Sequence, residues 1–192
     1  MRTALPTEEL RRRFVLESEV LGRLQHPGIA QIYKAGTYGE AGRERPFFAM
    51  ELVKGIPILE YCDTEKLDTK ARLELFVSVS QAIQHAHQKG IIHRDIKPSN
   101  VLVTLHDGVP VPKVIDFGIA KDTRSDAEAI TRNDMICGTP EYISPEQVKG
   151  TELTTSCDLY SLGIVFYELL TKELPFQHKN PLVLIRMHEE QS

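Results

Sequence analysis

A stretch of eight residues, His93–Asn100, brings together polar groups that are well suited to chemistry. Asp95 is followed two positions later by Lys97, and three positions after that by Asn100. A carboxylate can orient an attacking hydroxyl, a lysine can neutralise charge on a transferring phosphate, and an asparagine oxygen can bind Mg²⁺. The stretch lies between a predicted helix and a short apolar strand, Val101–Thr104. These residue types on one loop therefore indicate phosphoryl transfer.

Two further blocks follow along the chain. The tripeptide D-F-G at 116–118 lies 21 residues beyond Asp95, after a second predicted strand, Lys113–Ile115. The block Gly138–Glu146 reads G-T-P-E-Y-I-S-P-E. Together with H-R-D-I-K-P-S-N, these blocks resemble the eukaryotic-type (Hanks-type) protein kinase family, in which H-R-D-x-x-x-x-N precedes D-F-G and A-P-E. Ser144 replaces the commoner Ala of A-P-E, and the sequence around these motifs most resembles that of bacterial receptor-type Ser/Thr kinases.

The resemblance implies a role for each polar group of the loop. Asp95 would accept or orient the proton of a substrate hydroxyl, and Lys97 would neutralise charge on the γ-phosphoryl group of ATP. Asn100 and Asp116 would hold Mg²⁺, with Mn²⁺ as an alternative metal. Lys97 and the Pro-Ser pair after it resemble the Ser/Thr-specific subclass, so the implied partners are ATP and proteins with Ser or Thr acceptors.

A nucleotide site ahead of the loop is implied as well. A helix predicted from Thr7 to about Gln25 would correspond to helix αC of the family, with Glu17 in its ion-pairing position. Met50 would be the gatekeeper, and the backbone of the residues after it would bind adenine. The residues assigned to nucleotide binding are Glu17, Met50, Glu51, Val53, Leu102 and Asp116. The pattern alone leaves open whether residues 50–53 form this hinge or only a buried strand.

Further residues receive structural or regulatory roles from the resemblance. A phosphate on Thr131, with Thr123 and Ser125 as alternatives, would pair with Arg94 and Lys121 and order the activation loop. In the family, the position of Thr139 contacts the catalytic Asp and Lys beside the acceptor hydroxyl. The full group is His93, Arg94, Phe117, Gly118, Lys121, Thr131, Thr139, Glu146 and Asp158.

Helices at 7–25, 69–89, 156–170 and from about 181 are predicted to position these residues. Asp68 would cap the second helix, and one of its faces is traced by Leu73, Phe76, Val77, Ser80, Ile83 and His87. His85 and His87 are interpreted as ordinary helix histidines. The third helix is apolar nearly all round, which predicts full burial. Asp158 at its start must then be hydrogen-bonded, and in the family it accepts backbone N–H groups of the catalytic loop.

The strands and helices together predict an α+β, protein-kinase-like fold. Strands at 29–37 and 46–52 would form a hairpin, and those at 101–104 and 113–115 would be joined by the turn at 106–108. Residues 1–53 would be an incomplete N lobe of one helix and a hairpin, including the hinge. Residues 54–192 would be a mostly helical C lobe, cut near its αG helix.

The composition limits the classes of function. With 41% apolar and 26% charged residues the chain can bury a core, and its net charge of −4 and pI near 6.0 argue against nucleic-acid binding. Cys62, Cys137 and Cys157 show no metal-binding spacing and suit free thiols in the cytoplasm. No apolar run approaches the roughly 18 residues of a membrane span. A sensor or membrane segment fused outside this stretch stays open.

Two parts of the family pattern are not found in this sequence. The Gly-rich loop and the V-A-I-K strand would precede Met1, and the Arg that pairs with Glu146 would follow Ser192. We therefore expect a kinase catalytic domain represented by an incomplete chain. The alternative is a non-catalytic kinase remnant that binds a partner protein. A small-molecule phosphotransferase is disfavoured, because it would lack the block Gly138–Glu146.

Overall fold

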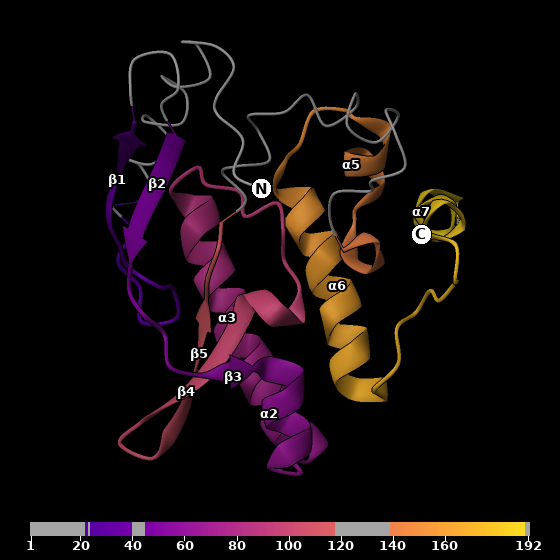
Figure 1. Ribbon diagram of the computed structural model, residues 1–192. Coiled ribbons are helices and arrows are strands. Elements are labelled where there is room, and N and C mark those ends of the chain that lie inside the picture. The colour runs from indigo at the N-terminus through magenta and orange to yellow at the C-terminus, as the bar shows by residue number, and fades with distance from the viewer. Residues whose placement is uncertain (1–21, 23, 40–44, 118–138, 191–192) are drawn as a thin grey trace.

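The computed structural model describes residues 22, 24–39, 45–117 and 139–190 (Figure 1). It is an α+β arrangement built around two long helices that lie side by side, α3 (Thr69–Gln88) and α6 (Thr155–Thr171). The shorter helical elements are α2 (Ile58–Thr64), η1 (Pro98–Asn100), η2 (Pro140–Tyr142), α5 (Pro145–Lys149) and α7 (Pro181–Glu190). The predicted fold class is confirmed.

The strands form two small antiparallel sheets. A hairpin pairs β1 (Ile32–Tyr38) with β2 (Arg45–Met50), and the second sheet runs in the order β3 (Ile56–Pro57), β4 (Val101–His106), β5 (Val109–Val114). Ile29 forms a parallel bridge with Val114 of β5 and so belongs beside the second sheet. The predicted start of the first strand at 29 is therefore wrong, because the backbone of Gly28 and Ala30 already bonds to Val114.

The β4–β5 pair is longer than predicted. Its two-residue turn consists of Asp107 and Gly108, which have φ of 51° and 79° and so favour a tight hairpin. Pro110 and Pro112, which precede the predicted strand at 113–115, lie within β5. β5 is the last strand of its sheet, and an edge strand tolerates residues that lack an N–H.

Helix α3 begins and ends as predicted, but its buried face differs. The Asp68 carboxylate accepts the N–H of Ala71 at 2.8 Å, and Gly90 with φ of 75° follows the end of the helix. The buried residues are Arg72, Leu75, Val79, Ala82, Ile83 and Ala86. Leu73 and Val77 of the predicted face are instead 37% and 53% exposed. Two neighbouring stripes of the helix carry apolar residues, and the one with small alanines faces the core.

Helix α6 starts at Thr155, one residue earlier than predicted, with Thr154 as N-cap. The predicted full burial is wrong, since Leu159 is 61% and Tyr167 44% exposed. Towards α3 the ring of Phe166 packs on that of Phe76, with centroids 4.8 Å apart. The described elements therefore cover only part of the circumference of this apolar helix.

The core lies between the β3–β4–β5 sheet and helices α2, α3 and α6. Its fully buried members include Ile58, Ile83, Val101, Val114, Val165 and Leu169. Ile96, only 3% exposed, carries the loop His93–Asn100 into this core. The loop is thus fixed at its middle, while the side chains of Asp95 and Lys97 remain partly exposed.

Some elements were not expected, and one expected helix is mostly undescribed. The short helices α2 and α5 do not follow from the pattern, whereas the helix predicted from about 181 is confirmed as α7. Of the helix predicted at 7–25, the structure describes Gly22, which is helical, and Leu24 and Gln25, which are not. The rest of this prediction lies outside the described residues. Of the helices that are described, none has the length and apolarity needed to cross a membrane.

Candidate active site

The polar groups of the loop meet at one point. Lys97 Nζ lies 3.1 Å from Asp95 Oδ2 and donates a hydrogen bond to Thr139 Oγ1 at 3.2 Å. Asn100 Nδ2 donates to the backbone carbonyl of Asp95 at 2.8 Å and to its Oδ2 at 3.2 Å. The side chains of Asp95 and Lys97 are each 20% exposed, whereas Asn100 is buried. The carboxylate of Asp95 and the ammonium group of Lys97 are therefore accessible from the surface, while the buried Asn100 holds Asp95 in place.

The buried ring of His93 fixes the start of the loop through two hydrogen bonds. The ring donates from Nε2 to the carbonyl of Ile115 at 3.0 Å and accepts the N–H of Asp95 at Nδ1 at 3.2 Å. A backbone N–H can only donate, so the proton of the ring is on Nε2. Burial lowers the pKa of His93 although nearby carboxylates act to raise it, and the ring stays neutral. The ring of Phe117 packs on it at a centroid distance of 4.6 Å.

Asp158, at the start of α6, holds the backbone of the loop. Its Oδ2 accepts the N–H of His93 and its Oδ1 that of Arg94, each at 2.8 Å. The predicted contact of this buried aspartate with the loop is confirmed. Arg94 has φ of 65°, a conformation that few non-glycine residues adopt and that the surrounding structure must enforce. The two hydrogen bonds to Asp158 provide that constraint.

The elements η2 and α5 hold Thr139 beside the loop. Gln147 of α5 donates from Nε2 to the carbonyl of Arg94 at 2.8 Å. The hydroxyl of Tyr142 in η2 donates to Glu168 Oε2 of α6 at 2.6 Å. The segment that carries Thr139 is therefore attached both to the loop and to the helix that anchors the loop.

Two oxygen-bearing side chains are placed where they could hold a cation. Asn100 uses its NH₂ group on Asp95, which leaves its oxygen as an acceptor. The backbone carbonyl of Asn100 accepts the N–H of Ile115 at 2.9 Å. Asp116 is the next residue along the chain, so this contact places it near Asn100. Asp116 is exposed, and its carboxylate makes no hydrogen bond or ion pair with the described residues. A carboxylate and an amide oxygen fit a hard divalent cation.

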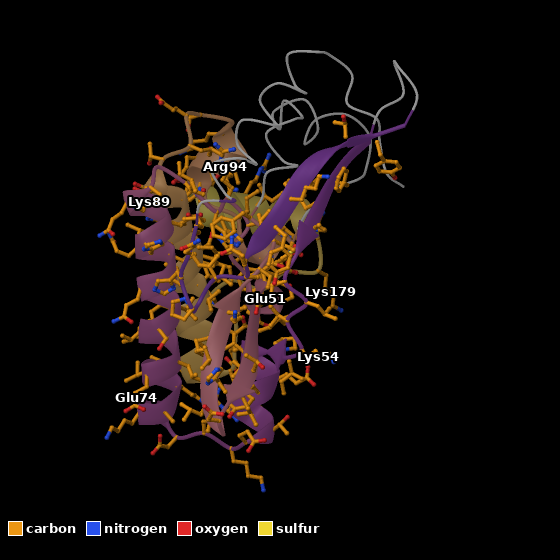
Figure 2. All side chains as sticks on the ribbon, turned by 90° about the vertical axis from the view of Figure 1, so that its left-hand side faces the viewer. Glu51, Lys54, Glu74, Lys89, Arg94 and Lys179 are labelled. Atoms are coloured by element: carbon orange, nitrogen blue, oxygen red, sulfur yellow. The ribbon has the colours of Figure 1, made fainter. Side chains whose placement is uncertain are left out.

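Glu51, directly after β2, makes hydrogen bonds through both its backbone N–H and its carboxylate. Its N–H donates to the carbonyl of Gln31 at 2.8 Å, and its carboxylate accepts from Gln31 N at 3.2 Å and from Lys113 Nζ at 2.6 Å. Burial alone would raise the pKa of Glu51, but these hydrogen bonds and the Lys113 charge lower it. Glu51 thus ties the hairpin to β5, near the foot of the hairpin in Figure 2. The backbone N–H and carbonyl of Val53 have no partner within the described part of the chain.

Of the remaining predicted site residues, three lie in the described part of the chain and four lie outside it. Met50 and Leu102 are half-buried on β2 and β4. Glu146 lies in the first turn of α5, and its charge adds to burial in raising the pKa of Tyr160 to about 12. The predictions for Glu17, Gly118, Lys121 and Thr131 concern positions outside the described residues.

The interpretation of His87 as an ordinary helix histidine, rather than a metal ligand shared with His85, did not anticipate its contact with Asp158. Its Nε2 lies 2.7 Å from Asp158 Oδ2, and its side chain is 9% exposed. The available signal was its place in the last turn of α3, the end that carries the loop. Figure 2 shows Lys89 and Arg94 together at this end of the helix. Sequence spacing could not identify the partner, which lies 71 residues away.

Comparisons with known proteins point to one family. The family model described as protein kinase domain matches residues 2–191. Serine/threonine-protein kinase PknB of Mycobacterium tuberculosis is 36% identical over 177 residues, or 92% of this chain and 28% of that protein. Serine/threonine-protein kinase pkn3 of Myxococcus xanthus is 38% identical over 190 residues, or 97% of this chain and 34% of that protein. The chain thus spans about a third or less of the length of these relatives.

A solved structure shows the same fold. The crystal structure of Rad53 1–466 in complex with AMP-PNP matches with a TM-score of 0.69 at 30% identity. The match covers 91% of this chain and 42% of that chain.

Proposed function

Because the chain belongs to the protein kinase family, we propose that it carries the phosphate-transfer site of a serine/threonine protein kinase. The family uses ATP, a divalent metal and protein substrates in general. The observation that carries the proposal is that Lys97 Nζ contacts both Asp95 Oδ2, at 3.1 Å, and Thr139 Oγ1, at 3.2 Å. This cluster offers an acceptor for a hydroxyl proton and a positive charge for a phosphate at the same place.

In this proposal Asp95 accepts the proton of a serine or threonine hydroxyl as the hydroxyl oxygen bonds to the γ-phosphorus of ATP. The bond from that phosphorus to the β–γ bridging oxygen breaks, and ADP leaves. Lys97 offsets the negative charge of the transferring phosphoryl group. No covalent bond to the protein forms, so positioning and electrostatic stabilisation supply the rate.

Asn100 and Asp116 are the proposed ligands of the divalent cation, with Mg²⁺ as first choice and Mn²⁺ as the alternative. Within the described residues, the side-chain oxygen of Asn100 and the carboxylate of Asp116 have no hydrogen-bond partner, which supports this assignment. A bound cation would neutralise phosphate oxygens of ATP. The pair needs phosphate oxygens and water to complete its coordination, since no cluster of three or more metal-ligating side chains occurs in the described ranges.

The hinge after Met50 is the proposed adenine site, with Leu102 beside it. The backbone N–H and carbonyl of Val53 have no partner among the described residues, which supports this role, since adenine offers one acceptor and one donor along its edge. Glu51 contributes through its backbone carbonyl, because its amide and carboxylate are already engaged. Glu17 stays a prediction for the ion pair of helix αC.

The finer assignments concern the acceptor residue, regulation and cellular setting. Thr139 next to Lys97 favours Ser or Thr acceptors, as do the names of the relatives. Phosphorylation of Thr131 with Arg94 and Lys121 as its partners stays a prediction, as does the division at residues 53 and 54. Cys62 and Cys157 are free and buried, which supports a reducing, cytoplasmic setting.

The test compares the chain with its Asp95→Asn variant in transfer of labelled γ-phosphate to a mixture of Ser- and Thr-containing peptides. We expect transfer with Mg²⁺ and a loss of at least about 100-fold in the variant, because the amide cannot take the hydroxyl proton. ATP–Mg²⁺ binding without transfer, equal in both proteins, would overturn the proposal in favour of a non-catalytic binding module.

A further inference from the structure

The buried carboxylate of Asp158 serves three donors from two directions. Two are the backbone N–H groups of His93 and Arg94, which belong to the loop. The third is Nε2 of His87, at 2.7 Å, from the last turn of α3. A carboxylate only accepts hydrogen bonds, so Nε2 of His87 must carry a proton. The thiol of Cys157 lies 3.9 Å from Oδ1 and adds a weak contact.

The donors are divided unequally between the two carboxylate oxygens. Oδ2 accepts from both His87 and His93, whereas Oδ1 accepts from Arg94. His87 therefore competes directly with the His93 amide for the position of one oxygen. A carboxylate held at both oxygens from both sides cannot rotate freely.

The other surroundings of His87 give its ring no alternative use. The ring lines a groove between α3 and α6 together with apolar residues that include Ile83, Leu162 and Phe166. Among the described residues, its recorded polar contact is the one with Asp158. A histidine whose single hydrogen bond goes to the anchor of a strained loop has a positioning geometry.

We propose that His87 is a positioning residue for phosphoryl transfer, which sets the orientation of the Asp158 carboxylate and through it the backbone at His93 and Arg94. This inference rests on the proposed function of Asp95. Asp95 follows Arg94 directly, and its N–H is bonded to the His93 ring. A rotation of the Asp158 carboxylate would therefore displace the base from the acceptor hydroxyl.

The kinetic test uses His87→Leu, His87→Gln and the control His85→Leu. Leucine keeps apolar bulk but removes the donor, whereas glutamine restores an N–H donor at a similar reach. We expect His87→Leu to lower kcat roughly 10-fold, as for other residues that orient a catalytic group, with KM for ATP unchanged. His87→Gln should recover most of the loss. His85 lies on the same helix with its Nε2 buried and without a partner in the described structure, so His85→Leu should keep kcat.

The spectroscopic test follows the amide protons of His93 and Arg94 by NMR. In His87→Leu we expect a large shift for the His93 amide, which shares Oδ2 with His87, and a smaller one for the Arg94 amide on Oδ1. A kcat within about twofold of the parent, or equal shifts for both amides, would overturn the proposal. If the parent transfers no phosphate, the proposed function fails, while the amide shifts still decide whether His87 orients the carboxylate.

Discussion

At the scale of single residues, the site depends on side chains that serve two neighbours at once. Lys97 contacts both Asp95 and Thr139, and Asn100 contacts both the backbone and the side chain of Asp95. Each of these groups is therefore oriented before a ligand arrives. Preorganised charges of this kind cost no reorganisation during the reaction.

The Thr139 hydroxyl gives a prediction at this scale. Thr139→Val keeps the shape of the side chain but removes the acceptor for Lys97, whereas Thr139→Ser keeps the acceptor. We expect the valine variant to transfer phosphate roughly 5-fold more slowly, as for one hydrogen bond of about 1 kcal/mol, and the serine variant to resemble the parent. Initial rates of phosphate transfer measure this.

The matched control is Thr151→Val, because the hydroxyl of Thr151 is exposed and bonds only to the carbonyl of Glu146. Its rate should equal that of the parent. A valine variant at 139 that is as fast as the serine variant would show that the Lys97 contact has no part in transfer.

Local motifs explain which site residues could be predicted. Asp95, Lys97 and Asn100 lie within one loop, so their residue types and spacing suffice to bring them together. His87 was missed because its role depends on Asp158, whose approach is set by the packing of α3 against α6. Sequence periodicity carries no information on such a contact.

At the scale of elements, Arg72 connects three helices. Its buried guanidinium donates to the carbonyls of Cys62, Leu67 and Leu169, each at 3.1 Å, and pairs with Asp63. The contact with Leu169 satisfies a carbonyl in the last turn of α6, which otherwise lacks a helical partner. Arg72 thus joins α2 and α3 to the end of α6.

We predict that Arg72→Met lowers the free energy of unfolding by about 3 kcal/mol, because it leaves buried carbonyls without donors. Arg72→Lys should recover little, since one ammonium group cannot reproduce the planar fork of a guanidinium. Urea unfolding followed by circular dichroism measures both variants.

The control for Arg72 is Lys70→Met on the same helix. Lys70 is 85% exposed and pairs with Glu74 at 4.0 Å, a surface contact worth at most about 0.5 kcal/mol. Equal stabilities of the Arg72→Met and Lys70→Met variants would contradict the role assigned to Arg72.

Helix α3 shows where prediction of the elements fails. Its ends followed from Asp68 and Gly90, which act locally. Its buried face could not be predicted in the same way. Residues 72–86 carry a second apolar stripe that includes Ala82 and Ala86, and hydrophobic periodicity gives such small residues less weight than larger apolar ones. Small residues face the core here because β5 packs closely on this helix, and that contact is tertiary.

At the scale of the whole molecule, histidines link stability to pH. Burial lowers the pKa of the buried His93 in the loop and His188 in α7. Partial burial and the nearby His85 lower the pKa of His26, which lies before β1. Below pH about 6.5 the unfolded chain therefore binds more protons than the folded one. Stability falls as the pH falls through this window, since protons then favour the unfolded state.

We predict a decrease in the free energy of unfolding between about pH 7 and pH 5.5, with a slope of up to about 1.4 kcal/mol per pH unit for each fully buried histidine. Glu51 and Asp63 have lowered pKa values in the folded state, so they stabilise the fold above their ordinary pKa values, 4.5 for Glu51 and 3.8 for Asp63, and lose this effect only at lower pH. Urea unfolding across the range measures the slope.

The control for the pH dependence is His106→Gln, because the side chain of His106 is 81% exposed. This variant should keep the parent slope. A free energy of unfolding that is flat between about pH 7 and pH 5.5 would contradict the assignment of neutral buried histidines.

The anchor of the loop has a consequence for biosynthesis. Asp158 lies 65 residues beyond His93 and 64 beyond Arg94. A ribosome that adds about 5–20 residues per second needs roughly 3 to 13 s to cover this distance. Throughout that interval the nascent chain carries Asp95 but not the carboxylate that shapes its backbone. Under the proposed function, phosphate transfer by a chain still under synthesis would have to wait until α6 has emerged, so the order of translation itself would delay the onset of activity.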